Sequence, residues 1–209
     1  MYLSRVLLNV GLRETIKALA SPSKFHGAIE SSFSGEKKRR LWRLDTISGK
    51  QYILILSEDI PDLNEFASQY GYVGKYETKD YSPLLDKIKT GDCWGFRLTA
   101  NPTISKMSEN SRGKVLAHIT AKHQKEWLIN RSENNGFSVE EDSFTVVQSK
   151  WYRFYKKDFD KSPAVQLLSV TFEGNLTITD ENKFKETLCN GIGREKAYGM
   201  GLLTVVKRR

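Results

Sequence analysis

Cysteine is scarce in this chain of 209 residues, and so is the chemistry that thiols support. Cys93 and Cys189 lie far apart and form no Cys-x-x-Cys pair, which argues against a zinc ribbon and against a disulfide framework. The apolar stretch from Leu3 to Val10 is interrupted by Arg5, and no signal-peptide core or membrane-spanning run follows it. We therefore predict reduced thiols, no membrane partner and a cytoplasmic location.

Clusters of side chains that could hold a metal are also lacking. Glu140-Glu141-Asp142 is typical of a charged loop, and no Asp-x-Asp or His-Glu-x-x-His arrangement is present. Only three histidines occur, and five residues separate His118 from His123, which on a helix would place them on different faces. We treat these two as structural and predict neither a metal nor another cofactor.

Positive charge is what the chain has in excess. Its formal net charge is +8, which favours polyanionic partners. Basic residues gather in three segments, of which the first leads into Trp42 and Arg43 and the third is interleaved with Trp151, Tyr152, Phe154 and Tyr155. The segments contain Lys37, Lys38, Arg39 and Arg40; Lys106, Arg112 and Lys114; and Lys150, Arg153, Lys156 and Lys157. One such segment is usually a solvated face, but three of them shift the balance toward RNA, since cations neutralise phosphates and aromatic faces stack on bases.

The most distinctive segment runs from Gly191 to Gly201 and has four glycines around a basic turn with Arg194 and Lys196. Glycine permits positive φ and close approach of the backbone to a ligand, so free N–H groups could bind phosphate. The run matches neither the dinucleotide-binding Gly-x-Gly-x-x-Gly pattern nor a P-loop. Two interpretations stay open: a phosphate-binding loop, or a helix C-cap followed by a tight turn.

His26 is the remaining histidine. Ser21-Pro22 is a good helix start, which places His26 in the first two turns, close to Lys24 in sequence and ahead of the run from Lys37 to Arg40. Imidazole exchanges protons near neutral pH and can act as a general acid or base on a phosphodiester. The alternative is a partly exposed histidine without a task.

The hydrophobic pattern predicts an α+β chain of two tandem ferredoxin-like, or RRM-like, domains. Strand patterns cover residues 3–10, 41–45, 52–56, 93–100, 144–155, 165–178 and 202–206; helical patterns cover 14–19, 61–66 and 123–130, and a further helix capped by Asp180 ends before Gly191. The polar stretch from Thr103 to Lys114 predicts the boundary, with domains 1–104 and 105–209.

Several segments together resemble one family. They are Met1-Tyr2-Leu3-Ser4-Arg5-Val6, the segment around His26, Arg97-Leu98-Thr99-Ala100-Asn101-Pro102, Phe172-Glu173-Gly174-Asn175-Leu176, and Gly191 through Leu203. The chain resembles the CasE-type CRISPR-associated endoribonucleases, the repeat-processing subunits of the type I-E Cascade complex. The matching segments span both halves of the chain in the same order as in the family.

The resemblance implies tandem RRM-like folds and metal-independent cleavage of CRISPR repeat RNA at the base of its stem-loop. The 2′-hydroxyl before the cut would attack the phosphate and leave a 2′,3′-cyclic phosphate and a 5′-hydroxyl, and the enzyme would stay on the crRNA hairpin. The family's catalytic histidine falls on His26, its glycine-rich loop on Gly191 to Gly201, and a basic segment on Lys106, Arg112 and Lys114. The implied partners are this RNA and the other Cascade subunits, without direct DNA contact.

The chain departs from the family around its histidine. Ser23 stands where members often carry tyrosine, and Ser31 where some carry lysine. We therefore assign the helper of His26 to Lys24 or to a lysine of the Lys37-Lys38 run. Two alternatives to the enzyme remain: a non-catalytic subunit that holds an RNA hairpin, and a generic RRM-type binder of single strands.

Overall fold

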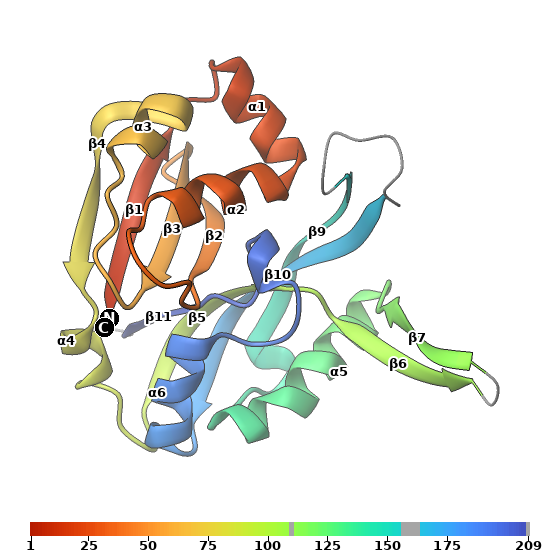
Figure 1. Cartoon of the computed structure of the whole chain (residues 1–209). Coiled ribbons are helices and arrows are strands. Elements are labelled where there is room, and N and C mark those ends of the chain that lie inside the picture. The colour runs from red at the N-terminus through yellow and green to blue at the C-terminus, as the bar shows by residue number, and fades with distance from the viewer. Residues whose placement is uncertain (109–110, 156–163, 208–209) are drawn as a thin grey trace.

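The computed structural model describes residues 1–108, 111–155 and 164–207, with the side chains of residues 106–108 and 111–113 excepted. The described chain forms two antiparallel sheets with helices packed against them, and a two-stranded hairpin projects to one side (Figure 1). No helix in these ranges is long and apolar enough to cross a membrane.

The first sheet has the strand order β2-β3-β1-β4. Its elements are β1 (Tyr2–Leu8), α1 (Arg13–Ala20), α2 (Pro22–Ser31), β2 (Leu41–Ile47), β3 (Lys50–Ser57), α3 (Asn64–Tyr70) and β4 (Gly71–Asp80). Ser48 and Gly49 both have positive φ and form the two-residue turn between β2 and β3. The succession of strands and helices, with β1 and β3 at the centre of the sheet, is the ferredoxin-like arrangement.

The second sheet repeats this order around β5 and β10, with β11 beyond β5 and β8 and β9 both paired to β10. Its elements are α4 (Ser82–Leu85), β5 (Cys93–Ala100), α5 (Ala121–Ser132), η1 (Glu133–Asn135), β8 (Phe137–Ser138), η2 (Glu141–Ser143), β9 (Phe144–Phe154), β10 (Val165–Ile178), α6 (Glu181–Asn190), η3 (Lys196–Tyr198) and β11 (Leu203–Lys207). The Asp180 carboxylate accepts from the N–H groups of Asn182 and Lys183, which confirms the predicted cap of α6. The prediction of two ferredoxin-like folds is confirmed.

The sequence missed three features. The helix expected from Pro61 begins only at Asn64, and β4 had no clear strand pattern because most of its side chains are exposed or half-buried. The polar stretch expected to divide the domains forms instead the hairpin of β6 (Thr103–Ser108) and β7 (Ser111–Ala117), inserted between β5 and α5. Polar residues suit a hairpin that stands away from the core as well as they suit a linker.

Strand pairing favours a different domain boundary. A division after residue 104 would assign β5 to the first domain, but β5 pairs along its whole length with β10 and along most of it with β11. Backbone hydrogen bonds on both edges make β5 integral to the second sheet. We therefore propose that the boundary lies within residues 81–92, between β4 and β5.

A buried arginine joins the two sheets. Arg43 on β2 is 1 % exposed and donates two 2.7 Å hydrogen bonds to the Asp45 carboxylate. Its remaining donors reach the second sheet, at the carbonyls of Arg97 (2.7 Å) and Leu202 (2.9 Å) and the hydroxyl of Thr204 (2.8 Å). The guanidinium is thus fully satisfied, as a buried charge must be.

Candidate active site

α2 places His26 at the surface, over the hydrophobic core between the first sheet and its helices. Pro22 opens the helix as predicted, with its φ preset for the first turn. Phe25 and Ile29 are completely buried, and the Phe25 ring lies edge-on to Trp42 at 5.9 Å. His26, next to Phe25, is half-buried and reaches the surface. Burial of large apolar side chains, each worth about 1.5–3 kcal/mol, therefore fixes the orientation of the helix that carries His26.

The glycine-rich loop packs against this same helix. Its short η3 turn contacts α2 and β2. The indole Nε1 of Trp42 donates a 3.2 Å hydrogen bond to the carbonyl of Ala197. Because Trp42 also contacts Phe25, one side chain of β2 links the loop to the helix of His26. The η3 turn and α2, more than 160 residues apart in sequence, thus meet at one place.

Gly199 is required for this contact. Its φ is +79°, and a Cβ there would lie 2.6 Å from the Trp42 ring. We expect Gly199→Ala to lower the free energy of unfolding by about 1–3 kcal/mol, because it adds backbone strain and a steric clash. Urea unfolding measures this. Gly27→Ala is the control, since a Cβ on α2 meets nothing within 4 Å and should raise stability by up to about 1 kcal/mol. Equal stability of Gly199→Ala and the unchanged chain would contradict the requirement.

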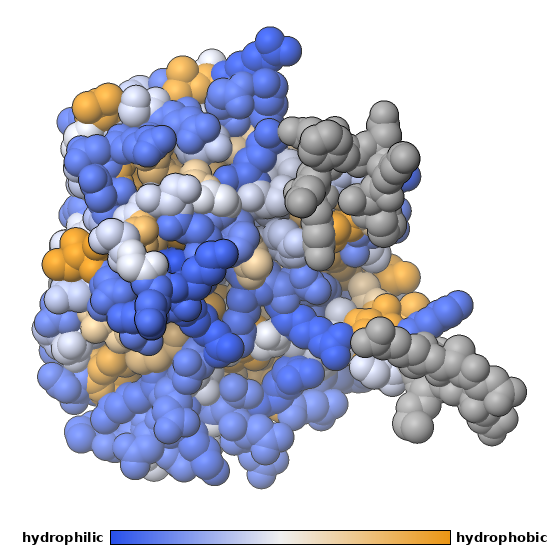
Figure 2. Space-filling model, in the orientation of Figure 1, coloured by the Kyte–Doolittle hydropathy of each residue, from blue (hydrophilic) through white to orange (hydrophobic). Residues whose placement is uncertain are grey.

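The glycine-rich loop carries two cations, Lys196 and Arg194. Lys196 is half-buried; burial, and secondarily the Arg39 guanidinium, lower the pKa of its ammonium. Arg194 is exposed on the same loop. Figure 2 shows strongly hydrophilic residues over the segment between α2 and β2, which contains Lys37 and Arg39. Positive charges that repel one another are stabilised by an anion placed between them.

Two predicted RNA contacts have other partners. Arg40 is buried, bonds the Glu30 carboxylate at 2.5 Å and lies over the Phe33 ring. It therefore anchors the segment before β2, and its buried guanidinium disfavours the predicted contact with RNA. Lys38 is exposed but pairs with Asp59 at 3.0 Å and with Glu58, and this pairing raises its pKa.

The geometry also disfavours Lys24 as the helper of His26. Residues two apart on a helix project to different sides. Lys24 lies toward α1, where its charge contributes to lowering the pKa of Glu14. Ser23, one turn before His26, is on the histidine side, and its hydroxyl lies 3.0 Å from that of Ser21. No contact within the described ranges joins Lys37 to His26, so its role stays a prediction.

The other predicted RNA contacts lie on the second domain. Lys106 pairs with Lys114 across the β6–β7 hairpin, and Arg112 lies on β7. Arg153 is exposed on β9, and Lys156 is outside the described residues. The hairpin therefore carries three of the predicted cations on a projecting element. This element lies away from α2, which the sequence did not reveal (Figure 1).

Sequence reasoning missed a groove between α5 and the base of the hairpin. His118 precedes α5 and is not on a helical face, so the argument that separated it from His123 was wrong; the two rings are 5.9 Å apart. Trp127 and Arg131 line the same groove, with the guanidinium 5.0 Å from the indole. The i, i+4 spacing of these two residues was the one available signal. Among the residues with described side chains, no three His, Cys, Asp or Glu gather as a metal site.

A family model described as CRISPR associated protein matches residues 1–207. The CRISPR-associated endoribonuclease Cse3 of Thermus thermophilus is 29 % identical over 220 residues, covering 98 % of this chain and 99 % of that protein. A solved structure of the CRISPR endoribonuclease Cse3 bound to a 19-nucleotide RNA is 30 % identical, with a TM-score of 0.82 over 99 % of this chain and all of the other. The chain belongs to this family of CRISPR-associated endoribonucleases.

The fold is shared by a more distant chain. A chain of a CRISPR RNA-guided surveillance complex is 20 % identical, with a TM-score of 0.76 and complete coverage of both chains. At that identity the likeness establishes the shared fold.

Proposed function

We propose that this protein is a metal-independent endoribonuclease that cuts CRISPR repeat RNA at the base of its stem-loop and stays on the product hairpin. The observation that carries the proposal is the position of His26 on α2 beside the glycine-rich loop, in a chain that matches Cse3 over 98 % of its length. Cse3 has been solved with RNA bound. Here a proton-transfer group and the cations of the loop adjoin one surface.

The reaction needs one proton moved at each end of the scissile phosphate. The 2′-oxygen forms a bond to phosphorus, the bond from phosphorus to the 5′-oxygen breaks, and the products are a 2′,3′-cyclic phosphate and a 5′-hydroxyl. His26 takes the proton from the 2′-hydroxyl or gives one to the leaving 5′-oxygen, which contributes about 10²–10⁴-fold. Alignment of the 2′-oxygen with the leaving group supplies much of the remaining acceleration.

Lys196 is the better helper for the charge that develops on the phosphate. It lies on η3, which packs on α2, and it is held half-buried near Arg39. An ammonium in a partly dry site stabilises a phosphorane oxyanion more strongly than one in water. Lys37 remains the second predicted helper and is an exposed residue of the segment between α2 and β2.

The partners we propose are CRISPR repeat RNA, the mature crRNA hairpin and the other subunits of a Cascade complex. The net charge of +8 and the cations of the β6–β7 hairpin support an RNA duplex as ligand. A-form RNA is recognised through shape, phosphates and a few base edges, which suits a projecting basic ribbon. The cytoplasmic location stays a prediction.

End-labelled repeat RNA incubated with the protein in excess EDTA tests the proposal. We expect one cut at the base of the stem at a rate within about twofold of that with Mg²⁺, because proton transfer and charge stabilisation come from side chains. The upstream product should keep its terminal phosphate on treatment with alkaline phosphatase until the cyclic phosphate is opened with acid. Loss of cleavage in EDTA, restored by Mg²⁺, would contradict metal independence.

Ser23 favours a second candidate, a subunit that binds the hairpin without cutting it. A hydroxyl in place of a phenol removes the phenol's proton donor and bulk near His26. The same incubation separates the two functions: tight binding of the hairpin with no product at any time supports the scaffold. Tighter binding of unstructured RNA than of the stem-loop would favour the generic single-strand binder.

A further inference from the structure

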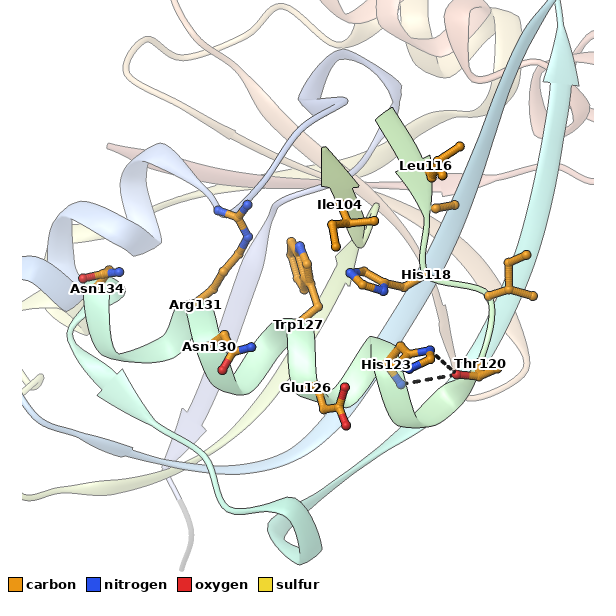
Figure 3. A pocket seen from close by; sticks show the side chains of 12 residues that line it. Ile104, Leu116, His118, Thr120, His123, Glu126, Trp127, Asn130, Arg131 and Asn134 are labelled. Atoms are coloured by element: carbon orange, nitrogen blue, oxygen red, sulfur yellow. Dashed lines mark hydrogen bonds between the residues drawn. The ribbon is translucent and has the colours of Figure 1, made fainter. Parts of the chain in front are cut away.

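The groove between α5 and the β6–β7 hairpin is a built site that the cleavage mechanism does not use. It has a volume of about 900 Å³ and is lined by residues of β6, β7 and α5, within the usual size of small-ligand sites, about 300–1,000 Å³. Figure 3 shows the Trp127 indole standing between the side chains of Arg131 and His118. Aromatic, amide and cationic groups thus converge on one space.

The walls of the groove are held in place before any ligand arrives. Gln124 is 1 % exposed, and its amide donates to the carbonyls of His118 (2.8 Å) and Ile119 (3.1 Å), which ties the segment before α5 to the helix. The backbone N–H of His118 donates to the Pro102 carbonyl at 2.9 Å. The His123 ring is fixed by a 2.9 Å hydrogen bond to the Thr120 hydroxyl. Such preorganisation lowers the entropic cost of binding.

The surfaces offered are those that hold a nucleotide. Burial and the nearby His123 lower the pKa of His118, and its imidazole ring offers a face on which a base can stack. Trp127 is 6 % exposed, and its Nε1–H finds no hydrogen-bond partner among the described residues. Arg131 is exposed at the rim and suits a phosphate. Exposed Ile104 and Leu116 form the apolar part of the wall at the base of the hairpin, where Figure 2 shows hydrophobic side chains at the surface.

The groove is continuous with the glycine-rich loop. A Cβ on Gly193 would lie 3.3 Å from the Cζ2 and Cη2 atoms of Trp127, so the edge of this indole lies beneath the loop. Trp127 therefore lies between the groove and the loop. The proposed ligand of the neighbouring cleavage site is RNA, a polyanion. The aromatic rings of the groove provide faces on which an unpaired base of that RNA can stack.

We propose that this groove binds one unpaired nucleotide flanking the RNA stem, with its base against the His118 ring and its phosphate on Arg131. The inference rests on the proposed function and adds a second contact to it. The nucleotide lies on either the 5′ or the 3′ side of the stem, and both carry the same chemistry. Recognition of a flanking nucleotide would let the protein distinguish a repeat within a longer transcript from an isolated hairpin.

Equilibrium binding to three fluorescent RNAs tests the groove: the hairpin alone, the hairpin with unpaired nucleotides on its 5′ side, and the same on its 3′ side. Each carries a 2′-deoxy group before the cut so that it stays intact. We expect one flank to tighten binding about five- to tenfold in the unchanged protein. His118→Ala and Arg131→Gln should each lose most of that gain and keep affinity for the bare hairpin within about twofold.

Lys122→Gln removes a charge from the exposed side of α5 outside the groove and should leave the gain intact. Trp127→Phe keeps a ring but removes the indole N–H, and it should lose part of the gain; its melting temperature is measured alongside. If His118→Ala weakens the binding of all three RNAs equally, the nucleotide site is overturned. It is also overturned if the variant changes the binding of none of them, and that outcome favours a protein partner on this face. If the unchanged protein does not bind the bare hairpin and does not cut the unmodified repeat RNA, the proposed function fails and the groove assignment fails with it.

Discussion

His26→Ala is expected to lower the rate of repeat RNA cleavage by about 10²–10⁴-fold, the usual contribution of a general acid or base. The half-buried ring lies on the outer side of α2, while Phe25 and Ile29 carry the packing of that helix. The variant should therefore fold normally and bind the hairpin within about threefold of the unchanged protein. Single-turnover cleavage with enzyme in excess measures the chemical step directly.

The matched control is Ser31→Ala, at the last position of the same helix. Its hydroxyl is exposed and bonds only the Gly27 carbonyl, at 3.1 Å, so cleavage should stay within about twofold. Lys196→Ala should fall between the two variants, with a smaller loss than His26→Ala. A His26→Ala protein that cuts at the full rate would remove His26 from the reaction and return it to the status of an ordinary surface histidine.

Arg43→Ala is expected to lower the free energy of unfolding by about 3–5 kcal/mol. It leaves the Asp45 carboxylate, 6 % exposed, with its nearest remaining cation on Arg97 at 3.7 Å. It also frees two carbonyls of the second sheet, those of Arg97 and Leu202, from their bonds to the guanidinium. Each unsatisfied buried group adds a penalty of its own. Urea unfolding followed by fluorescence gives the difference.

Arg5→Ala is the matched control, because Arg5 also lies in the first sheet and pairs with Glu77, but both side chains are more than a third exposed. Its loss should be below about 1 kcal/mol. The double variant Arg43→Met with Asp45→Leu removes both charges and should recover much of the stability. If Arg43→Ala costs no more than Arg5→Ala, the guanidinium does not hold the two sheets together.

Periodicity was sufficient for most elements of the fold. The strands of residues 41–57, the long β9 and β10 and the capped α6 follow directly from alternation, turn glycines and the Asp180 cap. The proposed boundary within residues 81–92 could not be predicted in this way, because nothing in the sequence of β5 states which strands it pairs with. Pairing partners of β5 lie more than 60 residues away.

The sequence by itself determined the helix of His26, the basic character of the chain and the resemblance that singled out the glycine-rich loop, since each depends on residues close to one another. The tertiary structure alone decided which cations stand beside that helix. It moved Arg40 into an ion pair, turned Lys24 toward α1, brought Lys196 against α2 through Trp42, and closed a groove around Trp127. These outcomes depend on contacts between distant segments, which local pattern does not encode.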